Sequence, residues 1–158
     1  MLALSDRFQE PMNPPSFNAL VDHLDTVGWN YAVFLKVYEV GASPDDALEE
    51  IVAKAFGNKV VLENIRPVTP SEVDREVRAA FCFGDRGGGL NPAELNKQSF
   101  VDLLNGAMQD IDLMSHEASA ITRFDVRKGF PMAGMFWEFA FLFAGRENAK
   151  VLFGCAQD

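Results

Sequence analysis

The sequence predicts an α+β domain in which a helix-rich N-terminal two thirds packs on a C-terminal antiparallel β-meander. Helix start signals and apolar stripes at helical spacing occur between residues 16 and 113. From residue 118 onward, side chains alternate in the manner of strands. The 158 residues are expected to form a single domain, 1–158, whose proline-rich residues 1–15 form an irregular N-terminal arm.

Helices are predicted where an N-cap side chain is followed by proline at the first helical position and an acid at the third. This pattern occurs at Ser43-Pro44, Thr69-Pro70 and Asn91-Pro92. Ser16 is expected to cap a further helix, whose apolar residues recur at helical spacing. The predicted helices are 17–27, 44–56, 70–81 and 92–113.

Residues 29–40 are ambiguous. Their aromatic and β-branched side chains favour a strand. However, Gly41 is followed closely by Ser43-Pro44, which is typical of a helix C-cap leading into the next helix. We favour a helix here, and a short strand at 59–62.

The C-terminal strands are predicted at 118–127, 133–144 and 150–156, with a hairpin turn at 145–148. The middle strand is strongly aromatic, and apolar residues lie on both of its faces. One face carries Met135, Trp137, Phe139, Phe141 and Phe143, and the other carries Phe136, Glu138, Ala140, Leu142 and Ala144. Because an exposed row of Phe would favour aggregation, this strand should be central in its sheet.

The formal charge of −9, from 23 acidic and 14 basic residues, disfavours binding to nucleic acid. No apolar stretch approaches the roughly 20 residues that span a bilayer, and the N-terminus lacks a signal-peptide pattern, so we expect a cytoplasmic protein. An acidic surface can steer a basic protein partner. The predicted partner-binding residues are Asp45, Asp46, Glu49 and Glu50, which crowd the first two turns of one predicted helix.

The glycine-rich loop 84–91 precedes a predicted helix and could bind an anion through Arg86, Gly87, Gly88 and Gly89. It lacks the Lys-Ser/Thr pair of a phosphate-binding P-loop. A mobile surface loop is the favoured alternative.

A second candidate surface involves the aromatic strand. Glu138 is the one charge within it and, if buried, needs a partner such as Arg123 or Arg127. The alternative is that Glu138 lies on an exposed part of its face. The set Phe136, Glu138, Ala140, Leu142 and Arg123 is therefore predicted to form an interface or pocket. Its apolar members suggest a homodimer or a contact with a partner through the sheet.

No cofactor, catalytic residue or metal site is predicted. The candidate ligands are Asp110, Asp112, His116 and Glu117, but side chains two apart on a helix point about 200° from each other. His23 is expected to be an exposed helix histidine. Cys82 and Cys155 lie in apolar contexts and are expected to be buried free thiols.

Two classes of function fit the sequence. The first is a small acidic cytoplasmic protein-binding module, such as an immunity-type inhibitor or a chaperone that acts on a basic partner. The alternative is a small-ligand-binding protein or enzyme, with a pocket between the aromatic face of the sheet and the helices. The scarcity of catalytic side-chain patterns favours the first class, and thus a protein that is not an enzyme.

Overall fold

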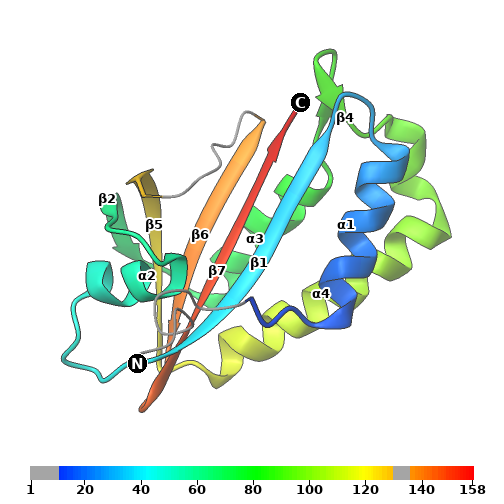
Figure 1. Ribbon diagram of the computed structural model, residues 1–158. Helices are drawn as coiled ribbons and strands as arrows, with labels where there is room; N and C mark the ends of the chain where they lie inside the picture. Colours follow the sequence, from blue (N-terminus) through cyan, green and yellow to red (C-terminus); the bar gives the residue numbers. More distant parts are fainter. Residues whose placement is uncertain (1–10, 130–135) are drawn as a thin grey trace, which may run out of the picture.

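A computed structural model describes residues 11–129 and 136–158. Within them, five antiparallel strands form one sheet in the order β1-β7-β6-β5-β2 (Figure 1). The sheet consists of β1 (Ala32–Gly41), β2 (Val61–Pro67), β5 (Ala120–Lys128), β6 (Trp137–Ala144) and β7 (Asn148–Gln157). The helices are α1 (Pro15–Val27), α2 (Leu48–Phe56), α3 (Pro70–Phe81) and α4 (Gln98–Glu117). A small hairpin of β3 (Gly84–Asp85) and β4 (Gly88–Gly89) precedes a 3₁₀ turn, η2 (Pro92–Asn96).

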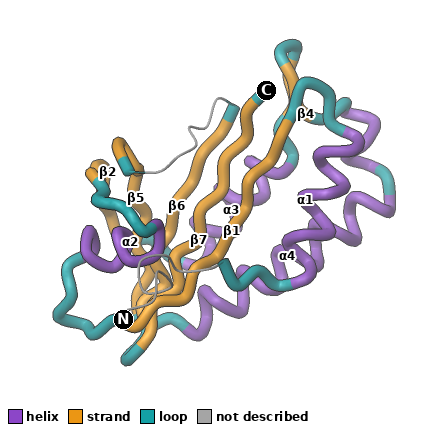
Figure 2. Tube along the Cα trace, in the orientation of Figure 1, coloured by secondary structure: helices purple, strands orange, loops and turns teal. Residues whose placement is uncertain are grey.

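Helices cover both faces of the sheet, as Figures 1 and 2 show. Helices α1, α3 and α4 pack on one face and enclose the larger core. Helix α2 packs alone on the opposite face over a second core. The α+β class and the C-terminal meander β5-β6-β7 are therefore confirmed, although β1 and β2 come from the N-terminal part of the chain.

The aromatic strand β6 is central, as predicted, because two strands lie on each side of it. Phe139, Phe141 and Phe143 enter the larger core, whereas Ala140 and Leu142 enter the second. All five are at most 6% exposed. The predicted residues 133–135, including Met135, lie outside the described residues.

Helix α3 has the predicted boundaries because its capping box forms. The Thr69 hydroxyl accepts from the Glu72 N–H at 3.2 Å, and the Glu72 carboxylate accepts from the Thr69 N–H at 2.7 Å. These two bonds satisfy backbone donors that a helix N-terminus otherwise leaves unpaired.

The other helix starts differ from the prediction. Helix α2 begins four residues late, because the Asp46 carboxylate accepts from the Ser43 N–H at 2.8 Å and closes a turn. The Asn91 side chain caps the 3₁₀ turn η2, so α4 begins only after Lys97. Ser16 does not cap α1; its hydroxyl donates to Asp110 of α4.

The predicted helix at 29–40 is wrong, since this segment contains β1. Strand β1 pairs with β7 along all ten of its residues, from Ala32 opposite Gln157 to Gly41 opposite Asn148. The strand propensity of these residues was the correct signal. Gly41 ends a strand rather than a helix.

The free edge of β1 is hydrogen-bonded to residues that precede the strand in the sequence. The Asn13 side chain donates to the Leu35 carbonyl at 2.9 Å and accepts from the Val37 N–H at 3.0 Å. The Met12 N–H donates to the Val37 carbonyl at 2.8 Å. The Asp25 carboxylate of α1 accepts from a further β1 N–H at 2.9 Å.

None of the helices in the described ranges combines the length and apolar character that a bilayer crossing requires.

Candidate functional site

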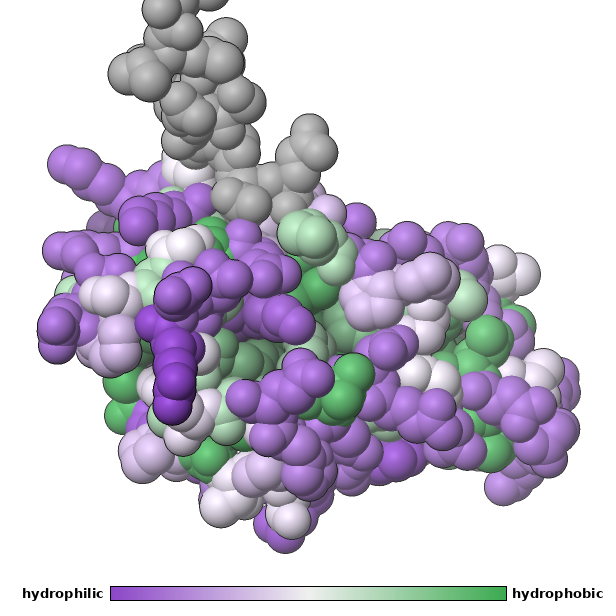
Figure 3. Space-filling view, turned by 90° about the horizontal axis from the view of Figure 1, so that it is seen from below, coloured by the Kyte–Doolittle hydropathy of each residue, from purple (hydrophilic) through white to green (hydrophobic). Residues whose placement is uncertain are grey.

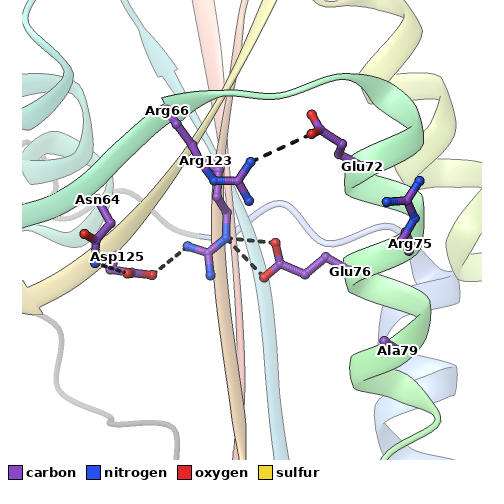
Figure 4. A pocket seen from close by; sticks show the side chains of 8 residues that line it. All are labelled: Asn64, Arg66, Glu72, Arg75, Glu76, Ala79, Arg123 and Asp125. Carbon is purple, nitrogen blue, oxygen red and sulfur yellow. Dashed lines mark hydrogen bonds and ion pairs between the residues drawn. The ribbon is translucent and has the colours of Figure 1, made fainter.

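A cleft of about 690 Å³ lies between α3 and the edge of the sheet formed by β5 and β2 (Figure 4). Side chains from three elements line it, and most of them are charged. They are Asn64 and Arg66 on β2, Glu72, Arg75, Glu76 and Ala79 on α3, and Arg123 and Asp125 on β5.

One wall of the cleft is the polar side of α3. Glu72, Glu76 and Ala79 follow one another at spacings of four and three residues, which places them on one face of a helix. The opposite side of the helix carries the buried Val73 and Val77. Burial of that apolar side in the larger core thus turns the acidic residues toward the sheet edge.

The other wall depends on an irregularity in β2. The register between β2 and β5 shifts between Glu63 and Arg66, and Asn64 has a φ of 52°. Such bulges re-aim side chains at sheet edges. The Asn64 amide donates to the Asp125 carboxylate at 2.8 Å as a result.

Arg123 forms the floor of the cleft and is the most heavily bonded residue there. Its Nε lies 2.9 and 3.1 Å from the two Glu76 carboxylate oxygens. Its Nη1 donates to Asp125 at 2.8 Å and to the Phe124 carbonyl. Its guanidinium also lies over the Phe141 ring, 5.6 Å from the centroid.

The Arg123 side chain is only 12% exposed, yet its charge is well compensated. Burial alone lowers the pKa of Arg123, but the hydrogen bonds and negative charges of Glu76 and Asp125 outweigh this effect and raise it. Arg123 therefore remains a cation that joins α3 to β5, and most of its donors are already occupied.

Two other cations at the cleft are more available. Arg66 is 3.9 Å from Glu72, with a side chain that is 56% exposed, so this pair contributes little. Arg75 is exposed and makes no ion pair in the described part of the chain. These guanidinium groups could meet the carboxylate or phosphate group of a ligand.

The structure does not bring together the side chains of Arg123 and Glu138. Arg123 reaches only the Glu138 backbone carbonyl, at 3.4 Å, because the two side chains project from opposite faces of the sheet. Glu138 lies beside Cys155, its partner on β7. Burial, together with the Glu138 charge, raises the pKa of the Cys155 thiol to about 11.

The remaining predicted interface residues are covered by this chain. Ala140 and Leu142 are buried in the core beneath α2. Phe136 packs instead on the larger core, where its ring lies 5.9 Å from Tyr31 and 5.3 Å from Phe83. These three side chains therefore do not form one surface.

The glycine-rich segment forms a hairpin whose N–H groups are largely bonded within the chain. The Gly87 N–H donates to Asp85 at 2.6 Å, and the Gly89 N–H donates to the Trp29 carbonyl at 3.1 Å. A Cβ at Gly88 would lie 2.7 Å from the Phe136 ring. These contacts explain the glycines by close packing, while Arg86 is exposed near the turn.

The acidic residues near α2 divide into two groups. Asp46 is half-buried and closes the turn before the helix. Asp45, Glu49 and Glu50 are exposed and make no ion pair within the described residues. Because α2 begins at Leu48, only Glu49 and Glu50 lie in its first turn.

Two of the four residues considered as metal ligands, Asp110 and His116, have side chains with other partners. Asp110 accepts from Ser16, and the His116 Nδ1 lies 2.7 Å from the Asp112 carbonyl. Across residues 11–129 and 136–158, no three His, Cys, Asp or Glu side chains form a group that could hold a metal.

His23 is half-buried rather than exposed. Its ring stacks on Phe100 of α4 with centroids 6.4 Å apart. Its Nε2 is buried and has no hydrogen-bond partner in the described structure. Of the cysteines, Cys155 is buried, as expected, and Cys82 is partly exposed; neither forms a disulfide.

Sequence reasoning identified Arg123 but missed the other residues of the cleft. Glu72 fitted the pattern of a helix start, and its position one turn before Glu76 could have indicated that both acids lie on one face of the helix.

No protein family, curated protein or solved structure significantly matches this chain.

Proposed function

We propose that this protein is a small cytoplasmic protein-binding module whose basic partner meets the exposed carboxylates of Asp45, Glu49 and Glu50. An immunity-type inhibitor and a chaperone are two forms that such a module takes. The observation that supports the proposal is that these three carboxylates lack ion-pair partners among the described residues.

The contrast with α3 strengthens this argument. Glu72, Asp74 and Glu76 all lie within ion-pair distance of an arginine, so their charges are partly compensated. The three carboxylates near α2 are not compensated in this way, and the whole chain carries −9. A local excess of negative charge raises the rate at which a positively charged partner associates.

The proposal is tested by affinity capture from the native host, followed by mass spectrometry. The wild-type protein should retain one stoichiometric basic protein at about physiological ionic strength and lose it as salt rises. Glu49→Gln/Glu50→Gln should retain much less of it.

The matched control is Asp22→Asn/Asp102→Asn, which changes the net charge equally on the exposed surfaces of α1 and α4. It should behave as the wild type does. Surface plasmon resonance with the captured partner should show a slower association rate for the α2 variant and a nearly unchanged dissociation rate. Equal binding by the wild type and both variants would refute the role of α2.

A second candidate function is binding of a small anionic ligand in the cleft, supported by the availability of Arg66 and Arg75. Thermal-shift measurements with inorganic phosphate and citrate test it. Stabilisation that disappears in Arg66→Gln/Arg75→Gln but persists in the equally charged control Arg86→Gln/Arg127→Gln would favour this candidate. No shift with either anion would count against it.

The homodimer suggested by the sequence is not part of the proposal. Its argument required Ala140 and Leu142 to seek cover from another molecule, and α2 of the same chain already supplies that cover.

A further inference from the structure

An apolar recess lies at the end of the molecule opposite the β3-β4 hairpin. It consists of two adjoining hollows of about 150 Å³ each, both lined by Met114 and Lys150. It is surrounded by Met12 and Pro14, by the C-terminal half of α4 and by the neighbouring ends of β1, β6 and β7. Figure 3 shows green and pale residues within a hollow of an otherwise largely hydrophilic face.

Two large apolar side chains at the recess are exposed to solvent. Met12 is 61% exposed and Leu113 is 57% exposed, although both line the same hollow. Beneath them, Val37, Met114 and Phe143 are at most 7% exposed and form part of the walls. Exposed apolar side chains that gather over a hollow are typical of an interaction site.

The backbone at the recess is held in place. The Met12 N–H donates to the Val37 carbonyl at 2.8 Å, and Leu113 lies within the long helix α4. A partner would therefore meet apolar groups on a largely preformed surface, which lowers the entropic cost of binding.

The polar residues around the recess carry an excess of negative charge. Glu39, Asp110 and Glu117 contribute three carboxylates, whereas Lys150 contributes one ammonium group. In the part of the chain that the structure describes, Lys150 forms no ion pair with any of them. The recess thus combines an apolar interior with a border that favours cations.

We infer that this recess binds a segment of a basic protein that inserts apolar side chains next to lysine or arginine residues. A cavity of about 150 Å³ can hold a benzene molecule, so each hollow suits one side chain of the size of leucine or phenylalanine. The inference rests on the proposed function for the basic character of the partner. It adds an apolar anchor at a surface separate from the acidic residues of α2.

The test is a set of NMR titrations of the labelled protein with short synthetic peptides. A peptide of alternating lysine and leucine should shift the backbone amides of Val37, Leu113 and Met114. A lysine–serine peptide of equal charge and a glutamate–leucine peptide of equal apolar content should shift them much less.

Leu113→Gln should weaken binding of the lysine–leucine peptide by about tenfold, because the apolar surface of one side chain is lost. Ile65→Gln is the matched control, since Ile65 is 51% exposed on β2, away from the recess, and should bind as the wild type does. Both substituted positions are exposed, so the fold should be retained.

Each alternative outcome is distinguishable. Equal shifts with the lysine–serine peptide would mean that charge alone attracts the ligand. Shifts confined to Glu49 and Glu50 would place binding at α2. Either result overturns the inference and leaves the proposed function standing. Concentration-dependent shifts of the recess without peptide would assign it to a second copy of this chain, which also overturns the inference. The absence of shifts with every peptide would do the same.

Discussion

Replacing Phe141 with alanine tests the central position of β6. Phe141 is fully buried, with its ring 5.8 Å from that of Phe139 and 6.3 Å from that of Phe143. The Arg123 guanidinium covers it at 5.6 Å. The substitution therefore removes contacts along the strand and with the floor of the cleft.

The magnitude follows from the buried surface. Loss of roughly 130 Å² of apolar area at about 25 cal/mol per Å² costs about 3 kcal/mol. Lost aromatic and cation–π contacts add about 1 kcal/mol. Because strands on both sides hold β6 in place, the cavity should not collapse, so we expect a loss of about 4 kcal/mol, within the range for buried phenylalanine.

Urea unfolding, followed by circular dichroism, measures this loss. Phe141→Ala should lower the midpoint without changing the dependence of the unfolding free energy on urea. The control Ile65→Ala, at an exposed apolar position, should cost less than about 1 kcal/mol. A loss at Phe141 as small as that of the control would refute the assignment of β6 to the core.

Three further predictions concern the charged network, the thiol and metals. Arg123→Met should destabilise the protein by about 2 kcal/mol in urea unfolding. This is less than a fully buried pair would cost, because Glu76 and Asp125 remain partly exposed and water can solvate them. A substitution that leaves the stability unchanged would contradict the bridging role of Arg123. The folded-state pKa values of Cys155 and Tyr31 are raised to about 11 and about 12. The contribution of these two groups to stability is therefore complete below their unfolded pKa values and should be lost as pH rises through the folded values. Alkaline unfolding curves that show no decline in stability would contradict this. EDTA should leave the melting temperature unchanged in calorimetry, whereas a drop that zinc or magnesium restores would contradict the absence of a metal requirement.

Sequence signals correctly predicted an element where its ends are determined by residues close together in the chain. The capping box at Thr69 and Glu72 gave the correct limits of α3 because both partners lie within one turn. The segment 29–40 was predicted incorrectly because its conformation depends on pairing with β7, more than a hundred residues away. Ser43-Pro44 resembled a helix start, but the nearby Asp46 supplied a competing turn.

The candidate site was less predictable for the same physical reason. Arg123 could be identified as a cation near the sheet, but its partner Glu76 is 47 positions away in the sequence. Glu76 lies on a helix that covers one face of the sheet, whereas Glu138, the predicted partner, projects from the other face. Which face a helix covers depends on packing of the whole domain. Neither residue's local sequence contains that information.

The bonds along the free edge of β1 also limit how the protein can assemble. An unpaired strand edge offers donors and acceptors to any extended chain, and sheets can grow from molecule to molecule in this way. Asn13 imitates a neighbouring strand by satisfying one donor and one acceptor with its amide side chain. At the other edge, the bulge near Asn64 and the missing N–H of Pro67 interrupt the pattern that an incoming strand would require. These features at both edges disfavour growth of the sheet from one molecule to the next.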